Sequence, residues 1–379
     1  DQLGVSSFAL NLGIGTSYVV AGTFQDFNLI GGSSLSNSGA VFIFDARTFV
    51  PKNEQIKVVS LSQFGTGTNG RVASDLFGTS VCASENYLAV GSYSHSYNDQ
   101  GSSSVTSAGA VYIYTRGTNL SWSLEQKIVG TGTNGRLEND HFGVRLNIDG
   151  TYLVVSSFSD FDSIGSSSIN SAGAVYIYSR SIVNSVPTWT QVQRLSGVGT
   201  NGRASESGLF GFTVALSGDF LTIGAPGNSF DSVGSSSKSR AGAVYVFSLN
   251  AGTWTSFQRI SASGTNSRLA NDSFGYSLDT DGTYLAIGSH LQDFNSTGSS
   301  SLSDAGAVYV YSRNGSTFNF QNKVTPSIRG LGDCFGSSVS ISTSIQIENE
   351  LVTPYLVVGS PLGDLDSLGT EEEIGAAYI

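Results

Sequence analysis

One phrase recurs along this chain and constrains its fold more than any other feature. In its clearest copy, Asp293–Tyr311, a polar loop rich in Ser and Gly runs directly into an apolar stretch of alternating Val and Tyr. Similar copies occupy Asp26–Phe44, Ser96–Tyr114, Asp160–Tyr178 and Ser229–Phe247, and a degraded copy runs from Asp364 to Tyr378. Self-similarity at a regular spacing predicts a repeat architecture in which equivalent units share one core.

A Phe-Gly pair marks the start of each unit. The pairs are Phe77-Gly78, Phe142-Gly143, Phe210-Gly211, Phe274-Gly275 and Phe335-Gly336, with Leu3-Gly4 as a weaker first copy. Successive glycines of these pairs are 74, 65, 68, 64 and 61 residues apart. The chain therefore divides into units 3–76, 77–141, 142–209, 210–273, 274–334 and 335–379, which we expect to form a single domain over residues 1–379.

Each unit has the pattern of four short strands. In the unit that begins at Phe274, these strands are Tyr276–Asp279, Tyr284–Gly288, Ala307–Tyr311 and Thr317–Val324. Turn signals, Asp281-Gly282 and Asn314-Gly315, separate the first pair and the last pair of strands. Four antiparallel strands per unit, repeated six times without a helical stretch, predict an all-β fold: a six-bladed β-propeller of four-stranded blades. The last unit stops in its third strand, so its blade lacks a fourth strand within this chain. We expect the polypeptide to continue past Ile379.

Composition excludes two classes of partner. The net charge is −11, which argues against nucleic acid, because nucleic-acid binding needs a basic surface. No apolar run approaches the roughly 20 residues of a membrane-spanning helix. The only two cysteines, Cys82 and Cys334, cannot form a disulfide framework and are expected to be small buried hydrophobic residues.

The stretch Phe210–Pro226 reads F-G-F-T-V-A-L-S-G-D-F-L-T-I-G-A-P. It resembles the FG-GAP repeat, and the resemblance covers nearly the whole chain, although Gly-Ser replaces Gly-Ala-Pro in other units. FG-GAP repeats build the propeller headpiece of integrin α subunits and occur in short bacterial and protist versions. The resemblance therefore implies a propeller, an extracellular or cell-surface location and a role in adhesion or as a scaffold.

The calcium loops of integrin-type repeats do not carry over. In those repeats, aspartates at alternate positions lie between strands one and two. Here that place holds only tight turns, such as Asp279-Thr280-Asp281-Gly282 and Ser217-Gly218-Asp219. These turns offer too few oxygens for the six to eight ligands that calcium needs.

Strand direction predicts where the polar loops lie. Because antiparallel strands alternate in direction, the loop between strands two and three and the loop between strand four and the next strand one leave the same edge of a blade. The 2–3 loops supply Asp26, Asn28, Ser96, Asn98, Asp160, Asp162, Ser229, Asp231, Asp293, Asn295, Asp364 and Asp366. The 4–1 loops follow the pattern T-N-G-R-x-x-x-D-x-F-G and supply Asn69, Arg71, Asp75, Asn134, Arg136, Asp140, Asn201, Arg203, Asn266, Arg268, Asp272, Arg329 and Asp333.

Three interpretations of these loops remain open. In the first, Asp and Asn form turns with their own backbone, while each Arg fixes a neighbouring loop by pairing with a carboxylate. In the second, Ca²⁺ binds the 2–3 loop side chains Asp26, Asn28, Asp160, Asp162, Asp231, Asp293, Asn295, Asp364 and Asp366. In the third, the same edge binds a glycan, and Phe27, Tyr97, Phe161, Phe230 or Phe294 stacks on a sugar ring.

The sequence shows no catalytic constellation, so we assign no catalytic residue. His95, His141 and His290 occupy unrelated positions in their units, whereas a catalytic triad needs its members in one place. Carboxylate pairs such as Asp160 and Asp162 could suggest glycoside hydrolysis, but they recur in nearly every unit. Sequons occur at Asn119, Asn271, Asn295 and Asn314, which are candidate N-glycosylation sites if the protein is secreted by a eukaryote.

These observations predict an extracellular, non-catalytic binding, adhesion or surface-structural module. Its partner would be a protein or a glycan at the cell surface or within an extracellular assembly. The alternative is a carbohydrate-active or lectin-type propeller that uses the edge built by the 2–3 and 4–1 loops.

Overall fold

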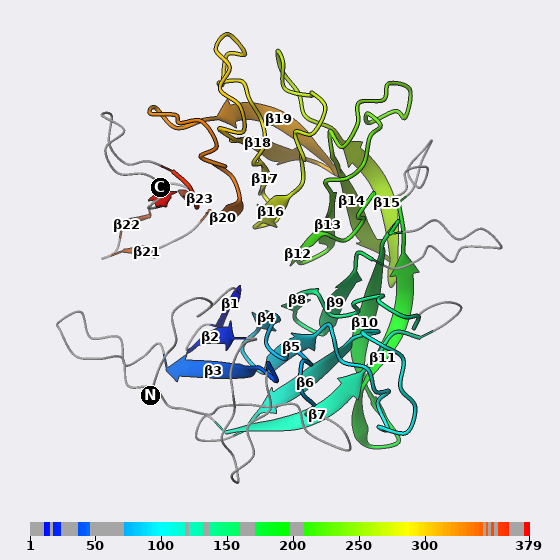
Figure 1. Cartoon of the computed structure of the whole chain (residues 1–379). Coiled ribbons are helices and arrows are strands. Elements are labelled where there is room, and N and C mark those ends of the chain that lie inside the picture. The colour runs from blue at the N-terminus through cyan, green and yellow to red at the C-terminus, as the bar shows by residue number, and fades with distance from the viewer. Residues whose placement is uncertain are drawn as a thin grey trace. The chain divides into compact units, whose positions relative to one another are not determined.

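A computed structural model shows the fold (Figure 1) and describes residues 11–15, 18–23, 37–45, 72–117, 121–131, 136–159, 171–197, 208–343, 346–347, 350–351, 355–363 and 375–379. All regular secondary structure in these ranges is β-strand, in six blade sheets and one small hairpin. In the same ranges, no helix is long and apolar enough to cross a membrane.

The blades follow one another along the chain, and neighbouring strands in each are antiparallel. Blade one contains β1 (Asn11–Gly15), β2 (Tyr18–Thr23) and β3 (Ala40–Asp45). Blade two contains β4 (Ser80–Ala83), β5 (Tyr87–Ser92), β6 (Ala110–Arg116) and β7 (Trp122–Ile128). Blade three contains β8 (Arg145–Asp149), β9 (Tyr152–Ser157), β10 (Ala174–Val183) and β11 (Val186–Leu195).

Blade four contains β12 (Thr213–Ser217), β13 (Phe220–Ala225), β14 (Ala243–Asn250) and β15 (Thr253–Ile260). Blade five contains β16 (Ser277–Thr280), β17 (Tyr284–Ser289), β18 (Ala307–Asn314) and β19 (Thr317–Val324). Blade six contains β20 (Ser338–Ser342), β23 (Tyr355–Ser360) and β24 (Ala376–Tyr378), and a hairpin of β21 (Gln346–Ile347) and β22 (Glu350–Leu351) lies between its first two strands.

The predicted fold class is confirmed: antiparallel propeller blades repeat along an all-β chain, and the last blade has three strands. The strands of blade five start and end within three residues of their predicted bounds. The β21–β22 hairpin was not predicted. The expected fourth strand of blade one lies outside the described residues.

Contacts along the chain form two compact units, and each has its own core. The first comprises residues 1–170 and 174–195, and the second comprises residues 171–173 and 196–379. In the first unit, Phe142 packs edge-to-face on Tyr176 with ring centroids 5.2 Å apart. In the second, Phe274 packs in the same way on Tyr309 at 5.3 Å. The Phe of each Phe-Gly pair is thus a core side chain, and its burial contributes about 2 kcal/mol or more.

Two glycines explain why the loops can approach each other so closely. Gly275 follows the core Phe274 with φ of 89°, and its N–H donates to the carbonyl of Gly288 at 3.0 Å. Gly306 has φ of 85°, and a Cβ there would lie 2.1 Å from the carbonyl oxygen of Phe335. Both positions therefore need glycine, for backbone conformation and, at Gly306, for space as well.

Candidate functional site

Each described blade carries its polar loops on one edge of its sheet. We call this the loop edge: it holds the strand 2–3 loop and the two connections that enter strand one and leave strand four. The opposite edge, the turn edge, holds the tight 1–2 and 3–4 turns. The antiparallel strand order of the blades produces this division, as expected from the sequence.

The 2–3 loops are closed by their own Asn or Asp side chains. Asp231 Oδ1 accepts the N–H of Ser235 at 2.9 Å, and Asp231 Oδ2 accepts the N–H of Ser236 at 3.0 Å. Burial opposes ionisation of Asp231, but the hydrogen bonds from Ser235 and Ser236 outweigh it and lower the pKa of the carboxyl. Asn98 and Asn295 accept equivalent bonds in blades two and five. These side chains form the turns of the first interpretation.

An arginine from the next connection fixes each of these loops. Arg136 donates to the carbonyl oxygens of Ser96 at 2.6 Å and of Ser103 at 3.3 Å. Arg268 and Arg329 make the equivalent pair of bonds to the loops of blades four and five. The arginines therefore fix the loops as expected, but their partners are backbone carbonyls and not carboxylates. Burial lowers the pKa of all three guanidinium groups.

The aspartate of the D-x-F-G pattern is buried beneath the loop edge. Asp272 Oδ2 accepts the N–H of Leu269 at 2.5 Å, and its backbone carbonyl accepts a hydrogen bond from Ser289 Oγ at 2.7 Å. The same pair of bonds recurs at three further aspartates: Asp75, Asp140 and Asp333. In blade four, Gly208 and Ala225 replace the Asp and the Ser together, so both partners are absent at once.

In blade two, a histidine bridges this aspartate to a lysine. His95 is fully buried; its Nδ1 lies 3.0 Å from Asp75 Oδ2 and its Nε2 lies 2.8 Å from Lys127 Nζ. Lys127 also donates to the carbonyl of Asn98 at 2.9 Å. Since the Lys127 ammonium can only donate, His95 Nε2 is the acceptor in this contact. Burial lowers the pKa of Lys127 to about 8, and the nearby carboxylate of Asp75 partly opposes the change.

Blade five keeps the aspartate and the lysine but replaces the histidine with Gln292. Gln292 Nε2 donates to Asp272 Oδ2 at 2.7 Å. Lys323 Nζ is buried and has no hydrogen-bond partner among the described residues. Burial raises the pKa of Asp272 to about 7 and lowers that of Lys323 to about 8. Such perturbed groups are often functional, but these two lie inside the blade and not in a cleft.

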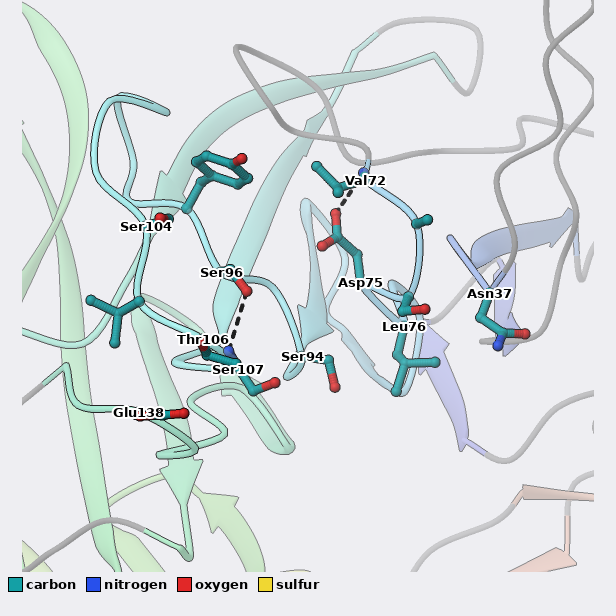
Figure 2. A pocket seen from close by; sticks show the side chains of 14 residues that line it. Asn37, Val72, Asp75, Leu76, Ser94, Ser96, Ser104, Thr106, Ser107 and Glu138 are labelled. Carbon is teal, nitrogen blue, oxygen red and sulfur yellow. Dashed lines mark hydrogen bonds between the residues drawn. The ribbon is translucent and has the colours of Figure 1, made fainter.

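One described cavity on a loop edge belongs to blade two and has a volume of about 810 Å³. We call it the blade-two cavity. Figure 2 shows its labelled lining: Asn37, Val72, Asp75, Leu76, Ser94, Ser96, Ser104, Thr106, Ser107 and Glu138. Tyr97 also lines it. Ser96 Oγ accepts the N–H of Ser107 at 3.2 Å, which joins the two ends of the 2–3 loop (Figure 2). Most of the lining is hydroxyl and carboxyl groups, and no Lys, Arg or His side chain takes part among the described residues.

The candidate calcium residues are placed only in part. Asp26, Asn28, Asp160, Asp162, Asp364 and Asp366 lie outside the described residues. Asp231 and Asn295 accept hydrogen bonds from their own loops, and Asp293 Oδ1 accepts the N–H of Asp304 at 2.9 Å. Within the described ranges, no three His, Cys, Asp or Glu side chains group as a metal site would require. Calcium binding at these residues stays a prediction.

Among the other residues predicted for the loop edge, Asn69, Arg71, Asn134, Asn201 and Arg203 lie outside the described ranges. Asn266 is described, and its Nδ2 donates to the carbonyl of Gly298 at 3.1 Å.

The three histidines do not converge. His141 directly precedes Phe142, whereas His290 stacks on Tyr276 with ring centroids 3.7 Å apart. Burial lowers the pKa of His141 and lowers that of His290 to about 4. Cys82 is buried as expected, whereas Cys334 is only half-buried, which corrects the prediction for that residue.

The sequons differ in exposure. Asn271 and Asn314 are exposed, Asn295 is half-buried, and Asn119 lies outside the described residues. N-glycosylation stays a prediction at all four.

The blade-two cavity was missed in the sequence, although a signal for it exists. Tyr97 stands where the other clear copies of the 2–3 loop have Phe27, Phe161, Phe230 and Phe294. Ser94 corresponds to Leu291 of blade five, and Glu138 corresponds to Leu331. Comparing blade two with blade five position by position therefore reveals the polar side chains that line this cavity.

The blades define a class: a protein of repeated antiparallel four-stranded sheets whose loops gather on one edge of each sheet. Comparison with family models identifies the repeat. The FG-GAP repeat matches residues 122–178, 189–247 and 254–311, and the chain belongs to the FG-GAP repeat family. Each match begins in the fourth strand of one blade, at Trp122, Trp189 or Trp254, and ends in the third strand of the next.

Comparison with solved structures gives a match to a hypothetical selenium-binding protein from Sulfolobus tokodaii. The sequences are 9% identical, the match covers 78% of this chain and 72% of that chain, and the TM-score is 0.33. At this TM-score the likeness supports no conclusion about function. No curated protein matches the chain.

Proposed function

We propose that this chain is an extracellular, non-catalytic interaction module whose loop edges bind a protein or glycan partner in adhesion or in a surface assembly. The observation that carries the proposal is the way the loops are held. One arginine and one buried aspartate fix the loop edge in blades two, four and five, with bonds to backbone atoms. Membership of the FG-GAP family supports a role in interaction.

This arrangement separates the bonds that hold the loops from the exposed side chains that a partner would contact. The fixing bonds use backbone carbonyls and N–H groups, so exposed loop side chains can vary without loss of the loop conformation. Binding modules commonly place variable loops on a rigid β-scaffold in this way. The second unit also exposes apolar side chains on its loop edges: Val233 is 69% exposed and Leu331 is 76% exposed. These two side chains are open to contact by a partner.

A comparison of the two edges tests the proposal. One triple variant, Gln100→Arg, Val233→Arg and Ser296→Arg, places three charges on exposed 2–3 loop positions. A matched triple variant, Ser181→Arg, Thr253→Arg and Ser316→Arg, places the same charges at exposed sites in or beside the 3–4 turns. Beads coated with each full chain are applied under flow to surfaces that carry extracellular-matrix glycoproteins or neutral polysaccharides.

We expect wild-type beads to adhere to at least one surface, the loop-edge variant to lose most of this adhesion and the turn-edge variant to retain it. No adhesion by the wild type, or equal loss in the two variants, would contradict the proposal.

A further inference from the structure

We infer that the blade-two cavity binds a neutral saccharide. The inference rests on the proposed interaction function and assigns it one site and one ligand class. It starts from polar groups that the fold leaves unused. Ser94, Tyr97, Ser104, Thr106 and Glu138 line the cavity, and their side chains form no hydrogen bond with the described residues. By contrast, the side-chain oxygens of Asn98, Asp231 and Asn295 accept hydrogen bonds from their own loops.

The chemistry of these groups selects the ligand. Hydroxyl groups both donate and accept hydrogen bonds, as sugar hydroxyls do, and the Glu138 carboxylate accepts them. Tyr97 adds an aromatic ring and a phenol in one wall. An anionic ligand is disfavoured because Asp75 and Glu138 line the cavity and no described cation does. An apolar ligand is disfavoured because it would cover hydroxyl groups without replacing their bonds to water.

Size and rigidity fit the same ligand class. A volume of about 810 Å³ lies within the range of roughly 300–1,000 Å³ that is typical of small-molecule sites. Arg136 holds the Ser96 and Ser103 carbonyls beside the cavity, and Asp75 holds the N–H of Val72 at 2.7 Å. A site fixed in this way loses little conformational entropy when a ligand binds.

Blade five shows that the repeat does not require these residues. Leu291 takes the place of Ser94, Phe294 that of Tyr97, and Leu331 that of Glu138, while the same Asp and Arg bonds fix the loops. Hydroxyl and carboxyl groups gathered at one blade, where an equivalent blade has apolar residues, point to a ligand. A requirement of the fold would affect both blades alike.

The experiment transplants blade-five residues into blade two. Methyl glucoside, methyl galactoside, methyl mannoside and N-acetylglucosamine are the neutral probes, and glucuronic acid is the charged one. Saturation-transfer NMR detects binding to the full chain, and calorimetry measures the Kd. The variants are Tyr97→Phe and the pair Ser94→Leu with Glu138→Leu. Phe294→Tyr in blade five is the matched control, and thermal melting confirms that each variant is folded.

We expect at least one neutral probe to bind the wild type and glucuronic acid to bind more weakly. Loss of the Tyr97 hydroxyl removes one hydrogen bond and should weaken binding by about three- to tenfold, and the paired variant should weaken it by tenfold or more. The Phe294→Tyr control should match the wild type. The inference is overturned if no neutral probe binds, if glucuronic acid binds best, or if folded variants retain the wild-type Kd.

The outcomes separate this inference from the proposed function. If the saccharides fail but the loop-edge variant still loses bead adhesion, the interaction module stands and its partner binds elsewhere on the loop edges. If the saccharides bind, a neutral polysaccharide and a glycoprotein with neutral N-linked glycans identify which source of the same chemistry competes with the probe. Competition by either one supports the site, and competition by neither contradicts it.

Discussion

The buried carboxyl of Asp272 should make the second unit less stable as pH rises. Asp272 is 1% exposed, and its Oδ2 accepts bonds from Leu269 and Gln292. Burial raises its pKa from 3.8 to about 7, partly opposed by the hydrogen bond from Leu269 and by Lys323 and Lys238, whereas Asp293 adds to the rise. The folded state binds the proton on Asp272 more tightly than the unfolded chain does. This proton therefore stabilises the fold fully below pH 3.8, and the stabilisation is lost as pH rises through 7.

The pKa shift sets the size of the effect. At 1.36 kcal/mol per pH unit, a rise from 3.8 to about 7 corresponds to about 4 kcal/mol of unfolding free energy. Lys323 acts in the opposite direction at higher pH. Burial lowers the pKa of Lys323 from 10.5 to about 8. The unfolding free energy therefore rises as pH rises from 8 to 10.5. His290 acts in the same direction as Lys323 at lower pH, because burial lowers its pKa from 6.5 to about 4, so the effect of Asp272 is measured as the difference between the wild type and Asp272→Asn.

Urea unfolding from pH 4 to pH 10 measures this profile. Trp254 lies in the second unit, and Trp122 and Trp189 lie in the first, so a background of Trp122→Phe and Trp189→Phe reports the second unit alone. The stability of the wild type relative to Asp272→Asn should fall between pH 5 and pH 7. Asp219→Asn, at an exposed turn, is the control and should have the same pH profile as the wild type. The reasoning is refuted if Asp272→Asn and the wild type have the same pH profile.

Four further outcomes follow from the geometry. Gly306→Ala should lower the unfolding free energy by about 2 kcal/mol or more, because the new Cβ would clash with the Phe335 carbonyl oxygen. Gly315 also has positive φ but has open space around it, so Gly315→Ala should lower the unfolding free energy by only about 1 kcal/mol; urea unfolding measures both. Arg136→Met should cost about 2 kcal/mol and speed amide exchange over residues 94–107, and unchanged exchange there would contradict the fixing role of Arg136. EDTA should change the melting midpoint by no more than about 1 °C, because the described loop oxygens already accept hydrogen bonds. A midpoint lowered by several degrees would support calcium binding at the other predicted residues. His95→Gln should preserve the fold, because blade five contains Gln292 at this position, and a melting midpoint lowered by more than about 5 °C would show that the histidine bridge is required.

The strands and the placement of the loops were predicted well because both depend on the types of residue in the sequence. Alternation of apolar residues and the Asp-Gly and Asn-Gly turns placed the strands of blade five, and strand direction alone placed the polar loops on one edge. The Phe of each Phe-Gly pair is buried, as a large apolar residue at a fixed place in a repeat should be.

The sequence did not predict the partners within the loop edge. Arg136 was expected to pair with a carboxylate, yet it donates to two backbone carbonyl oxygens. Every residue has such a carbonyl, so the sequence does not show which of them accepts the bond. Cavities are missed for a related reason: they depend on side chains being small. Ser94 reads as an ordinary loop residue until it is aligned with Leu291 of blade five. The β21–β22 hairpin was missed because its strands have only two residues each.

Hydrogen exchange by mass spectrometry, with and without the neutral pyranoside that binds best, tests the central claim most directly. A saccharide in the blade-two cavity should slow exchange over residues 94–107 and 136–140 and leave the equivalent loop of blade five, residues 291–304, unchanged. Slower exchange in both blades alike, or only on a turn edge, would contradict the assignment of binding to the loop edge of blade two.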